Sequence, residues 1–149
     1  MILADANLLI YASAESSPHY KASRDWLEAQ LNSSVRLGLS WPSLLAYLRV
    51  MTNPRIFSSA VTVRDAWKQV DSWLDCPNVW IPLPTERHRS ILADLLHGLG
   101  RGANHVPDAD LAALAIEHGL TLCTADAGFA RFAGLKWMNP IAGHQRRRP

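Results

Sequence analysis

Long apolar runs and cysteines are scarce in this chain of 149 residues, and their scarcity excludes several classes of protein. No apolar stretch approaches the roughly 20 residues that a membrane-spanning helix needs, so we expect no contact with a membrane. The N-terminus has no basic segment before its apolar residues, and Asp5 interrupts them, which is atypical of a signal peptide. Cys76 and Cys123 show no metal-ligand spacing. We therefore expect reduced thiols and a cytoplasmic protein.

An excess of charge of one sign is also missing. Lys and Arg number 15 against 13 Asp and Glu, and three of the 15 are the arginines at 146–148. Without these three, 12 basic residues face 13 acidic ones, which leaves a net charge of −1. The overall charge therefore does not indicate a nucleic-acid-binding surface, and any basic patch has to be local.

The motifs of three enzyme classes are absent or lack their context. The six histidines form no HExxH or HxxxH pair, and no GxSxG marks a serine nucleophile. The glycines at 98, 100 and 102 resemble a phosphate-binding loop, but they follow an expected helix instead of a strand. Zinc enzymes, serine hydrolases and dinucleotide-binding enzymes are therefore disfavoured.

Short apolar runs alternate with helical patterns along the chain. We expect strands at 1–4, 35–39, 79–83, 120–123 and 135–138, the last at a sheet edge. Ser17, Thr62 and Thr85 are expected to cap helices. The alternation predicts an α/β fold in which helices wrap a parallel sheet. With no repeat and no linker, we expect one domain, 1–142, and a disordered basic tail, 143–149.

The segment 106–129 has the clearest pattern. Pro107 and Asp108 indicate a helix start, an apolar helical face follows, and Gly119 is typical of a helix end. The next apolar run leads directly to Asp126. A helix that packs on a sheet and feeds straight into a strand runs antiparallel to that strand. The helix start and the strand end then share one edge of the sheet, so we expect Asp108 and Asp126 to meet there.

A third carboxylate is expected at the same edge. The first apolar run ends in Asp5, with Asn7 close behind, and open α/β sheets bind ligands at the carboxyl ends of parallel strands. Three carboxylates without a nearby Lys raise one another's pKa and repel. Mg²⁺ or Mn²⁺, hard cations that prefer oxygen ligands, would balance this charge. The structural alternative makes Asp108 a helix cap and Asp126 a turn residue.

Several short motifs occur in an order and spacing that carry a family resemblance. They are Asp5-Ala-Asn7-Leu, Leu48-Arg49, Thr52-Asn53-Pro54-Arg55, Val106-Pro107-Asp108-Ala109, Glu117-His118-Gly119 and Thr124-Ala125-Asp126 with Phe129. On these motifs the chain resembles the PIN-domain ribonucleases, in particular the VapC-type toxins of bacterial toxin–antitoxin pairs.

This resemblance implies a three-layer α/β/α sandwich with a short parallel sheet and Mg²⁺-dependent cleavage of RNA phosphodiesters. It implies that Asp5, Asp108 and Asp126 are the catalytic and metal-binding acids and that Thr124 supports them. It also implies inhibition by a small VapB-like antitoxin, and we expect a homodimer or a hetero-oligomer with that antitoxin.

The chain departs from the family at Tyr47, where many members have Glu. Tyr cannot be an anionic metal ligand at neutral pH, so the number of metal ions is open. Asp110 could supply the missing acid, and Asn7 is a second auxiliary candidate. On a regular helix Asp110 points about 200° away from Asp108, so this role requires Asp108 to be a non-helical cap. Alternatively, Asp110 only complements the helix dipole.

Four arginines, Arg49, Arg55, Arg101 and Arg131, are candidates for contacts with RNA phosphates, with a solvated surface charge as the alternative for each. Two other functions stay open at this point. One is a phosphatase-like Mg²⁺-dependent phosphoryl-transfer enzyme with Asp5 as nucleophile. The other is a non-catalytic module that binds nucleic acid or protein and uses its acids structurally.

Overall fold

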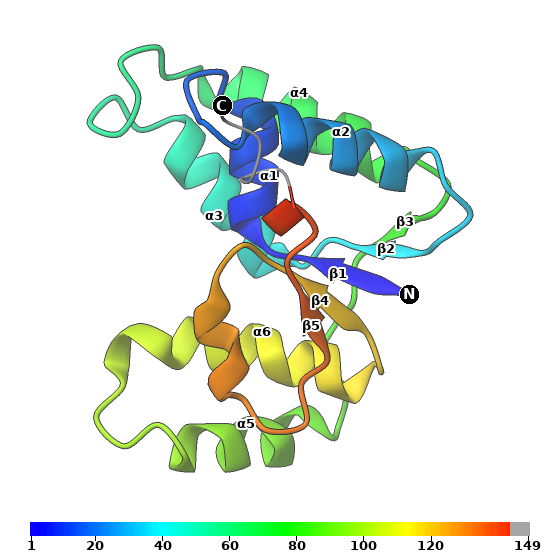
Figure 1. Cartoon of the computed structure of the whole chain (residues 1–149), viewed down its shortest axis with the longest axis vertical. Helices are drawn as coiled ribbons and strands as arrows, with labels where there is room; N and C mark the ends of the chain where they lie inside the picture. The colour runs from blue at the N-terminus through cyan, green and yellow to red at the C-terminus, as the bar shows by residue number, and fades with distance from the viewer. Residues whose placement is uncertain (144–149) are drawn as a thin grey trace.

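A five-stranded parallel sheet lies between two layers of helices in the computed structural model, which describes residues 1–143 (Figure 1). The strands are β1 (Ile2–Ala4), β2 (Leu37–Gly38), β3 (Val79–Trp80), β4 (Thr121–Cys123) and β5 (Trp137–Met138). Their order in the sheet is β3-β2-β1-β4-β5, and all neighbouring pairs are parallel. The expected α/β/α sandwich is confirmed, and β5 lies at an edge as expected.

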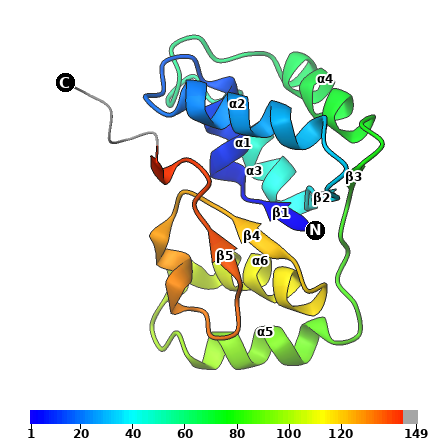
Figure 2. The same ribbon diagram turned by 45° about the vertical axis from the view of Figure 1, so that its right-hand side comes forward.

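The helices divide between the two faces of the sheet (Figures 1 and 2). One layer contains α1 (Ala6–Ser13), α2 (Tyr20–Leu31), α3 (Trp41–Met51) and α4 (Val63–Leu74). The other contains α5 (His88–His97) and α6 (Val106–Glu117). Two 3₁₀ turns, η1 (Ala103–His105) and η2 (Ala127–Arg131), precede α6 and follow β4.

Successive side chains of β1 pack against the two helix layers on opposite faces of the sheet. Leu3 packs in the core cluster that includes α6 and η2 residues, whereas Ala4 packs in the cluster formed with α1–α4. Both side chains are fully buried. Successive strand side chains point to opposite faces, so this short strand fixes its own position between two cores and with it the position of Asp5.

Two of the expected helix caps are wrong. α2 begins at Tyr20, and the Ser17 hydroxyl accepts a hydrogen bond from the His19 N–H at 3.1 Å. α5 begins at His88, and Thr85 Oγ1 accepts from the Arg87 N–H at 3.2 Å. A hydroxyl that bonds the N–H two residues on forms a turn, and this local geometry competes with capping.

The other expected helix and strand boundaries agree better with the structure. Thr62 caps α4, since its hydroxyl accepts from the Asp65 N–H at 3.1 Å. α6 begins at Val106, one residue before the expected Pro107. β3 stops at Trp80, short of the expected 83, because Pro82 has no N–H for the sheet.

No helix among residues 1–143 is long and apolar enough to span a membrane. The expected disordered tail was 143–149. Gly143 is within the described residues, and the remaining six, 144–149, lie outside them.

Candidate active site

Asp5 follows β1 directly and is held by two side chains. Its Oδ2 accepts hydrogen bonds from Asn7 Nδ2 at 2.8 Å and from Thr124 Oγ1 at 2.7 Å. Asn7 Nδ2 also lies 3.0 Å from Thr124 Oγ1. β1 pairs with β4, so Thr124, the residue after β4, comes to lie beside Asp5. Asp5, Asn7 and Thr124 therefore form one hydrogen-bonded group at the carboxyl ends of two adjacent strands.

Thr124 also connects Asp5 to Asp126. Its side chain is fully buried, and its hydroxyl oxygen accepts from the Asp126 N–H at 3.0 Å while donating to Asp5. Asp126 is the N-cap of η2, where its Oδ1 accepts from the Gly128 N–H at 2.7 Å. One buried hydroxyl thus fixes the relative position of two carboxylates that are far apart in the sequence.

Asp108 comes to this edge from the other helix layer. It is the third residue of α6, and its Oδ2 lies 3.2 Å from Nδ1 of His105, the N-cap of that helix. His105 was missed by the sequence analysis. Its position three residues before Asp108, next to a helix start, was the available signal, because residues at this spacing are neighbours on a helix surface.

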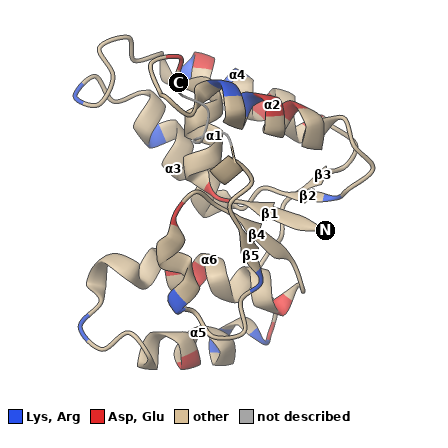
Figure 3. Ribbon diagram, in the orientation of Figure 1, with Lys and Arg blue, Asp and Glu red and all other residues tan. Residues whose placement is uncertain are grey.

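The three carboxylates interact electrostatically. Burial raises the pKa of Asp5 above its ordinary value, and the charges of Asp108 and Asp126 add to the rise. Hydrogen bonds from Thr124 and from the Ala6 N–H oppose it. Figure 3 shows acidic residues at the end of β1 and in the segment after β4, where the two helix layers meet. The structure therefore brings the three acids to one edge of the sheet.

The donor set is chemically suited to a hard cation, but the side chains are not gathered around one point. Among the described residues, no three His, Cys, Asp or Glu side chains are close enough to ligate one metal ion as they stand. Each known hydrogen bond occupies one oxygen of Asp5, Asp108 or Asp126, and a carboxylate has two. Carboxylate oxygens are the ligands that Mg²⁺ prefers, so the chemistry of this set suits that ion.

Comparison with known proteins identifies the family. Residues 2–135 match the PIN domain. The chain belongs to the PIN domain family. It is 42% identical over 142 residues to Ribonuclease VapC37 of Mycobacterium tuberculosis, covering 95% of this chain and 99% of the relative. It is 36% identical over 141 residues to Ribonuclease VapC33 of the same species, with coverage of 95% and 99%.

Solved structures share the fold of this PIN domain at lower identity. VapBC2 from Rickettsia felis, bound to a DNA fragment from their promoter, aligns with a TM-score of 0.69 and 19% identity, covering 93% of this chain and 98% of the other. FitAcB from Neisseria gonorrhoeae aligns with a TM-score of 0.67 and 19% identity, with coverage of 95% and 99%. The matched segment of the PIN domain includes all three carboxylates.

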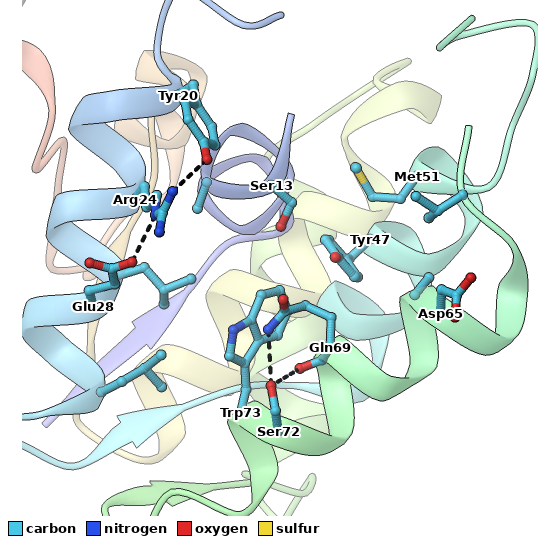
Figure 4. Close-up of a pocket in the computed structure, with 15 residues that line it drawn as sticks. Ser13, Tyr20, Arg24, Glu28, Tyr47, Met51, Asp65, Gln69, Ser72 and Trp73 are labelled. Atoms are coloured by element: carbon cyan, nitrogen blue, oxygen red, sulfur yellow. Dashed lines mark hydrogen bonds and ion pairs between the residues drawn. The ribbon is translucent and has the colours of Figure 1, made fainter. Parts of the chain in front are cut away.

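Tyr47 packs in the core cluster of the α1–α4 layer of this PIN domain. Its ring packs against Trp73, with 4.9 Å between centroids and 61° between planes. Burial raises the pKa of the Tyr47 hydroxyl, and a hydrogen bond with Ser13 opposes the rise. Tyr47, Trp73 and Ser13 line a cavity of about 520 Å³ between α1, α2, α3 and α4 (Figure 4). Asp5, Asp108 and Asp126 are not part of its lining. Tyr47 is therefore a core residue of the α1–α4 layer.

The carboxylate of Asp110 contacts His88. Its Oδ1 lies 2.9 Å from Nε2 of His88, whose Nδ1 lies 2.6 Å from Oε1 of Glu117. The N-cap of α6 is His105, so Asp108 sits within the helix and is not the non-helical cap that the auxiliary role of Asp110 required. Asp110 and Glu117 are seven residues apart, two helical turns, which was the only sequence signal for this network.

The four candidate arginines of the PIN domain are all exposed. Arg49 lies in the last turn of α3, and Arg55 lies in the loop that leads to α4. Arg101 lies between α5 and η1, and Arg131 ends η2.

Proposed function

We propose that this PIN domain is a Mg²⁺-dependent endoribonuclease and the toxin of a VapBC-type toxin–antitoxin pair. The observation that supports it most is Asp5, a largely buried carboxylate whose pKa is raised by the charges of Asp108 and Asp126 and which, among the described residues, has no Lys or Arg side chain hydrogen-bonded to it. A protein gains nothing in stability from such repulsion, so the arrangement is explained by a cation. The relatives named ribonucleases VapC37 and VapC33 support RNA as the substrate.

Each residue of the site has a distinct task in this proposal. Asp5, Asp108 and Asp126 would hold Mg²⁺, which when bound lowers the pKa of water and offsets charge on the phosphate. Thr124 fixes the position of Asp126 relative to Asp5, because its buried hydroxyl bonds both residues. Asn7 orients Asp5 Oδ2. Asn7 and Thr124 restrict the Asp5 carboxylate to few rotamers, so less entropy is lost at Asp5 when the site is loaded.

The exposed arginines would bind the RNA backbone on either side of the cleavage point. Arg forms charge-assisted, often bidentate hydrogen bonds with phosphates, and such contacts position the strand without reading its sequence. Base selection would come from the loops around the edge, because proteins read RNA sequence mainly in single-stranded segments.

The proposed partner is a small VapB-like antitoxin, with the toxin as a homodimer or a hetero-oligomer. The cavity between α1, α2, α3 and α4 is lined by buried apolar residues that include Leu27, Met51 and Trp73, and by exposed charged residues that include Arg24 and Asp65. Figure 4 shows Arg24 and Asp65 on opposite sides of this cavity. This combination suits an amphipathic segment that lies in a groove. The similar structures of VapBC2 and of VapBC-1 from Haemophilus influenzae support an assembly of this kind.

Substrate discrimination tests the enzymatic proposal. Purified protein is incubated with RNA and, separately, with a small phosphomonoester, in Mg²⁺, in Mn²⁺ and in a chelator. The proposal predicts internal RNA cleavage that needs the metal and no phosphomonoester hydrolysis. Phosphomonoester hydrolysis alone would indicate a phosphatase, and RNA binding without cleavage would indicate a non-catalytic module.

Growth tests the toxin proposal. Expression of the chain without a partner should slow growth, and Asp108→Ala should be tolerated at the same protein level. Equal toxicity of both forms would separate the growth effect from RNA cleavage and contradict the proposal.

A further inference from the structure

The side chain of Arg131 is held in place near Asp126, one of the three acids at the carboxyl edge of the sheet. Its Nε donates a hydrogen bond to the carbonyl oxygen of Gly128 at 2.7 Å. The N–H of the same Gly128 donates to Asp126 Oδ1, also at 2.7 Å. The two backbone polar groups of one residue thus hold a carboxylate of the candidate metal site and a guanidinium.

Gly128 lets these two charged groups approach each other. A Cβ added at Gly128 would lie 2.8 Å from Asp126 Oδ1 and 3.3 Å from Arg131 Nη2. The guanidinium end and the carboxylate therefore border the same small space, which only a glycine leaves open. Their side chains do not form a direct ion pair within the described structure.

The two terminal nitrogens of the Arg131 guanidinium, Nη1 and Nη2, can bind a phosphate at this site. The bond to Gly128 engages Nε, and no hydrogen bond of Nη1 or Nη2 is formed with the described residues, so these atoms keep their N–H donors for another acceptor. These donors form a planar fork that matches two oxygens of a phosphate. The nearby acids repel a phosphate. The positive charge of the Arg131 guanidinium, held near Asp126, would offset that repulsion where the substrate approaches the acids.

We propose that Arg131 is a catalytic residue that binds the non-bridging oxygens of the scissile phosphate, with Gly128 as the residue that orients it. This inference rests on the proposed ribonuclease function. Preorganised donors aimed at charge that grows in the transition state accelerate the chemical step more than they strengthen substrate binding. Arg131 therefore acts mainly on kcat, whereas an ordinary backbone contact acts mainly on KM.

A purely structural role for Arg131 makes different predictions. Its side chain lines a small cavity of about 230 Å³ with Leu95, Leu99 and Phe132, so its stem also contributes to packing between α5 and η2. If packing were its only task, Arg131→Lys would preserve activity, because Lys keeps a long aliphatic stem. If it clamps phosphate, Lys replaces the fork with a single point charge.

The test compares Arg131→Ala, Arg131→Lys and the control Arg89→Ala, whose side chain is exposed on α5. The measurements are kcat and KM on a short RNA with a mapped cleavage site, and the rise in melting temperature on adding Mn²⁺. We expect Arg131→Ala to lower kcat on the order of 10²–10³-fold with KM nearly unchanged and the Mn²⁺ response retained. Arg131→Lys should stay close to Arg131→Ala, and Arg89→Ala should match the unaltered protein.

Guanidinium ion supplies a second readout that packing would not produce. At concentrations well below those that unfold proteins, it should raise the cleavage rate of Arg131→Ala and leave that of Arg89→Ala unchanged. Unaltered kcat in Arg131→Ala, full activity in Arg131→Lys, or loss of the Mn²⁺ response together with activity would each overturn the assignment. Absence of metal-dependent cleavage by the unaltered protein would instead overturn the proposed function, and this inference with it.

Discussion

The imidazole of His88 lies 2.6 Å, Nδ1 to Oε1, from the carboxylate of Glu117, whose side chain has no exposed surface. Glu117 Oε2 also accepts from the Thr85 N–H at 2.9 Å and from its hydroxyl at 2.5 Å. On the other side of the ring, Nε2 faces Asp110. The start of α5 is therefore attached to the N-terminal half and to the last residue of α6 through a single imidazole between two carboxylates.

This network gives the stability of the fold a defined pH dependence. Burial lowers the pKa of His88, but bonds to Glu117 and Asp110 outweigh it and leave the pKa raised. Burial raises the pKa of Glu117, but bonds from Thr85 and His88 leave it lowered. The His88 contribution is complete below its ordinary pKa of 6.5 and is lost as pH rises through the raised value. The Glu117 contribution is complete above 4.5 and is lost as pH falls through the lowered value.

Urea unfolding across this range measures the effect. His88→Gln should cost about 3 kcal/mol between pH 4.5 and 6.5 because it leaves Glu117 buried without its cation, and less at high pH. His97→Gln, a change at an exposed position at the other end of α5, is the control. A constant difference between His88→Gln and the unaltered protein at every pH would show that the imidazole is not charged.

We predict that cleavage depends on the hydrogen bonds of the Thr124 hydroxyl more than on the volume of the Thr124 side chain. Thr124→Val keeps the volume but removes the donor to Asp5 and the acceptor for the Asp126 N–H. Cleavage should fall about 10–100-fold, as for the loss of a residue that orients metal ligands. Thr124→Ser, which retains the hydroxyl, should recover most of the activity, and an inactive Ser variant would show that the methyl contact is what counts.

Gly128→Ala should damage the site without damaging the core. The new Cβ would lie 2.8 Å from Asp126 Oδ1, so that carboxylate must move. We expect a weaker Mn²⁺-induced rise in melting temperature and slower cleavage, with the melting temperature of the metal-free protein little changed. Gly143→Ala, whose new Cβ would meet nothing within 4 Å among the described residues, is the matched control. An unchanged Mn²⁺ response in Gly128→Ala would remove Asp126 from the site.

Tyr47→Phe separates the core role of this residue from a role in metal binding. Phe preserves the contact with Trp73 and loses only the hydrogen bond to Ser13, for a cost of about 1 kcal/mol. Thermal unfolding with and without Mn²⁺ measures both quantities. The metal response should equal that of the unaltered protein, and a reduced response would place the Tyr47 hydroxyl in the site.

The sequence predicted where the acids meet because chain direction decides it. Asp5 follows β1, Asp126 follows the parallel neighbour β4, and Asp108 lies in the first turn of the helix before β4, so topology brings them to one edge. The short strands were less predictable, since apolar runs such as 35–39 contain more β-forming residues than the sheet uses.

Side-chain direction was not predictable from the sequence. The contact of His88 with Glu117 spans 29 residues and depends on how α5 packs on α6. The orientation of Tyr47 depends on the packing of α3 against α4, which the motif around it does not describe. Arg131 was one of four equivalent exposed arginines until the turn at Gly128 distinguished it.

Cleavage by Asp5→Asn tests the central claim most directly. Asn keeps the size of the side chain and its acceptor oxygen but removes the charge that Mg²⁺ would balance, and Asp71→Asn, at an exposed position on α4, is the control. Single-turnover cleavage of one defined RNA is measured over a range of Mg²⁺ concentrations for the three proteins. We predict that Asp71→Asn matches the unaltered protein and that Asp5→Asn falls on the order of 10²–10³-fold or more. Cleavage by Asp5→Asn at the unaltered rate, at every Mg²⁺ concentration, would contradict the account.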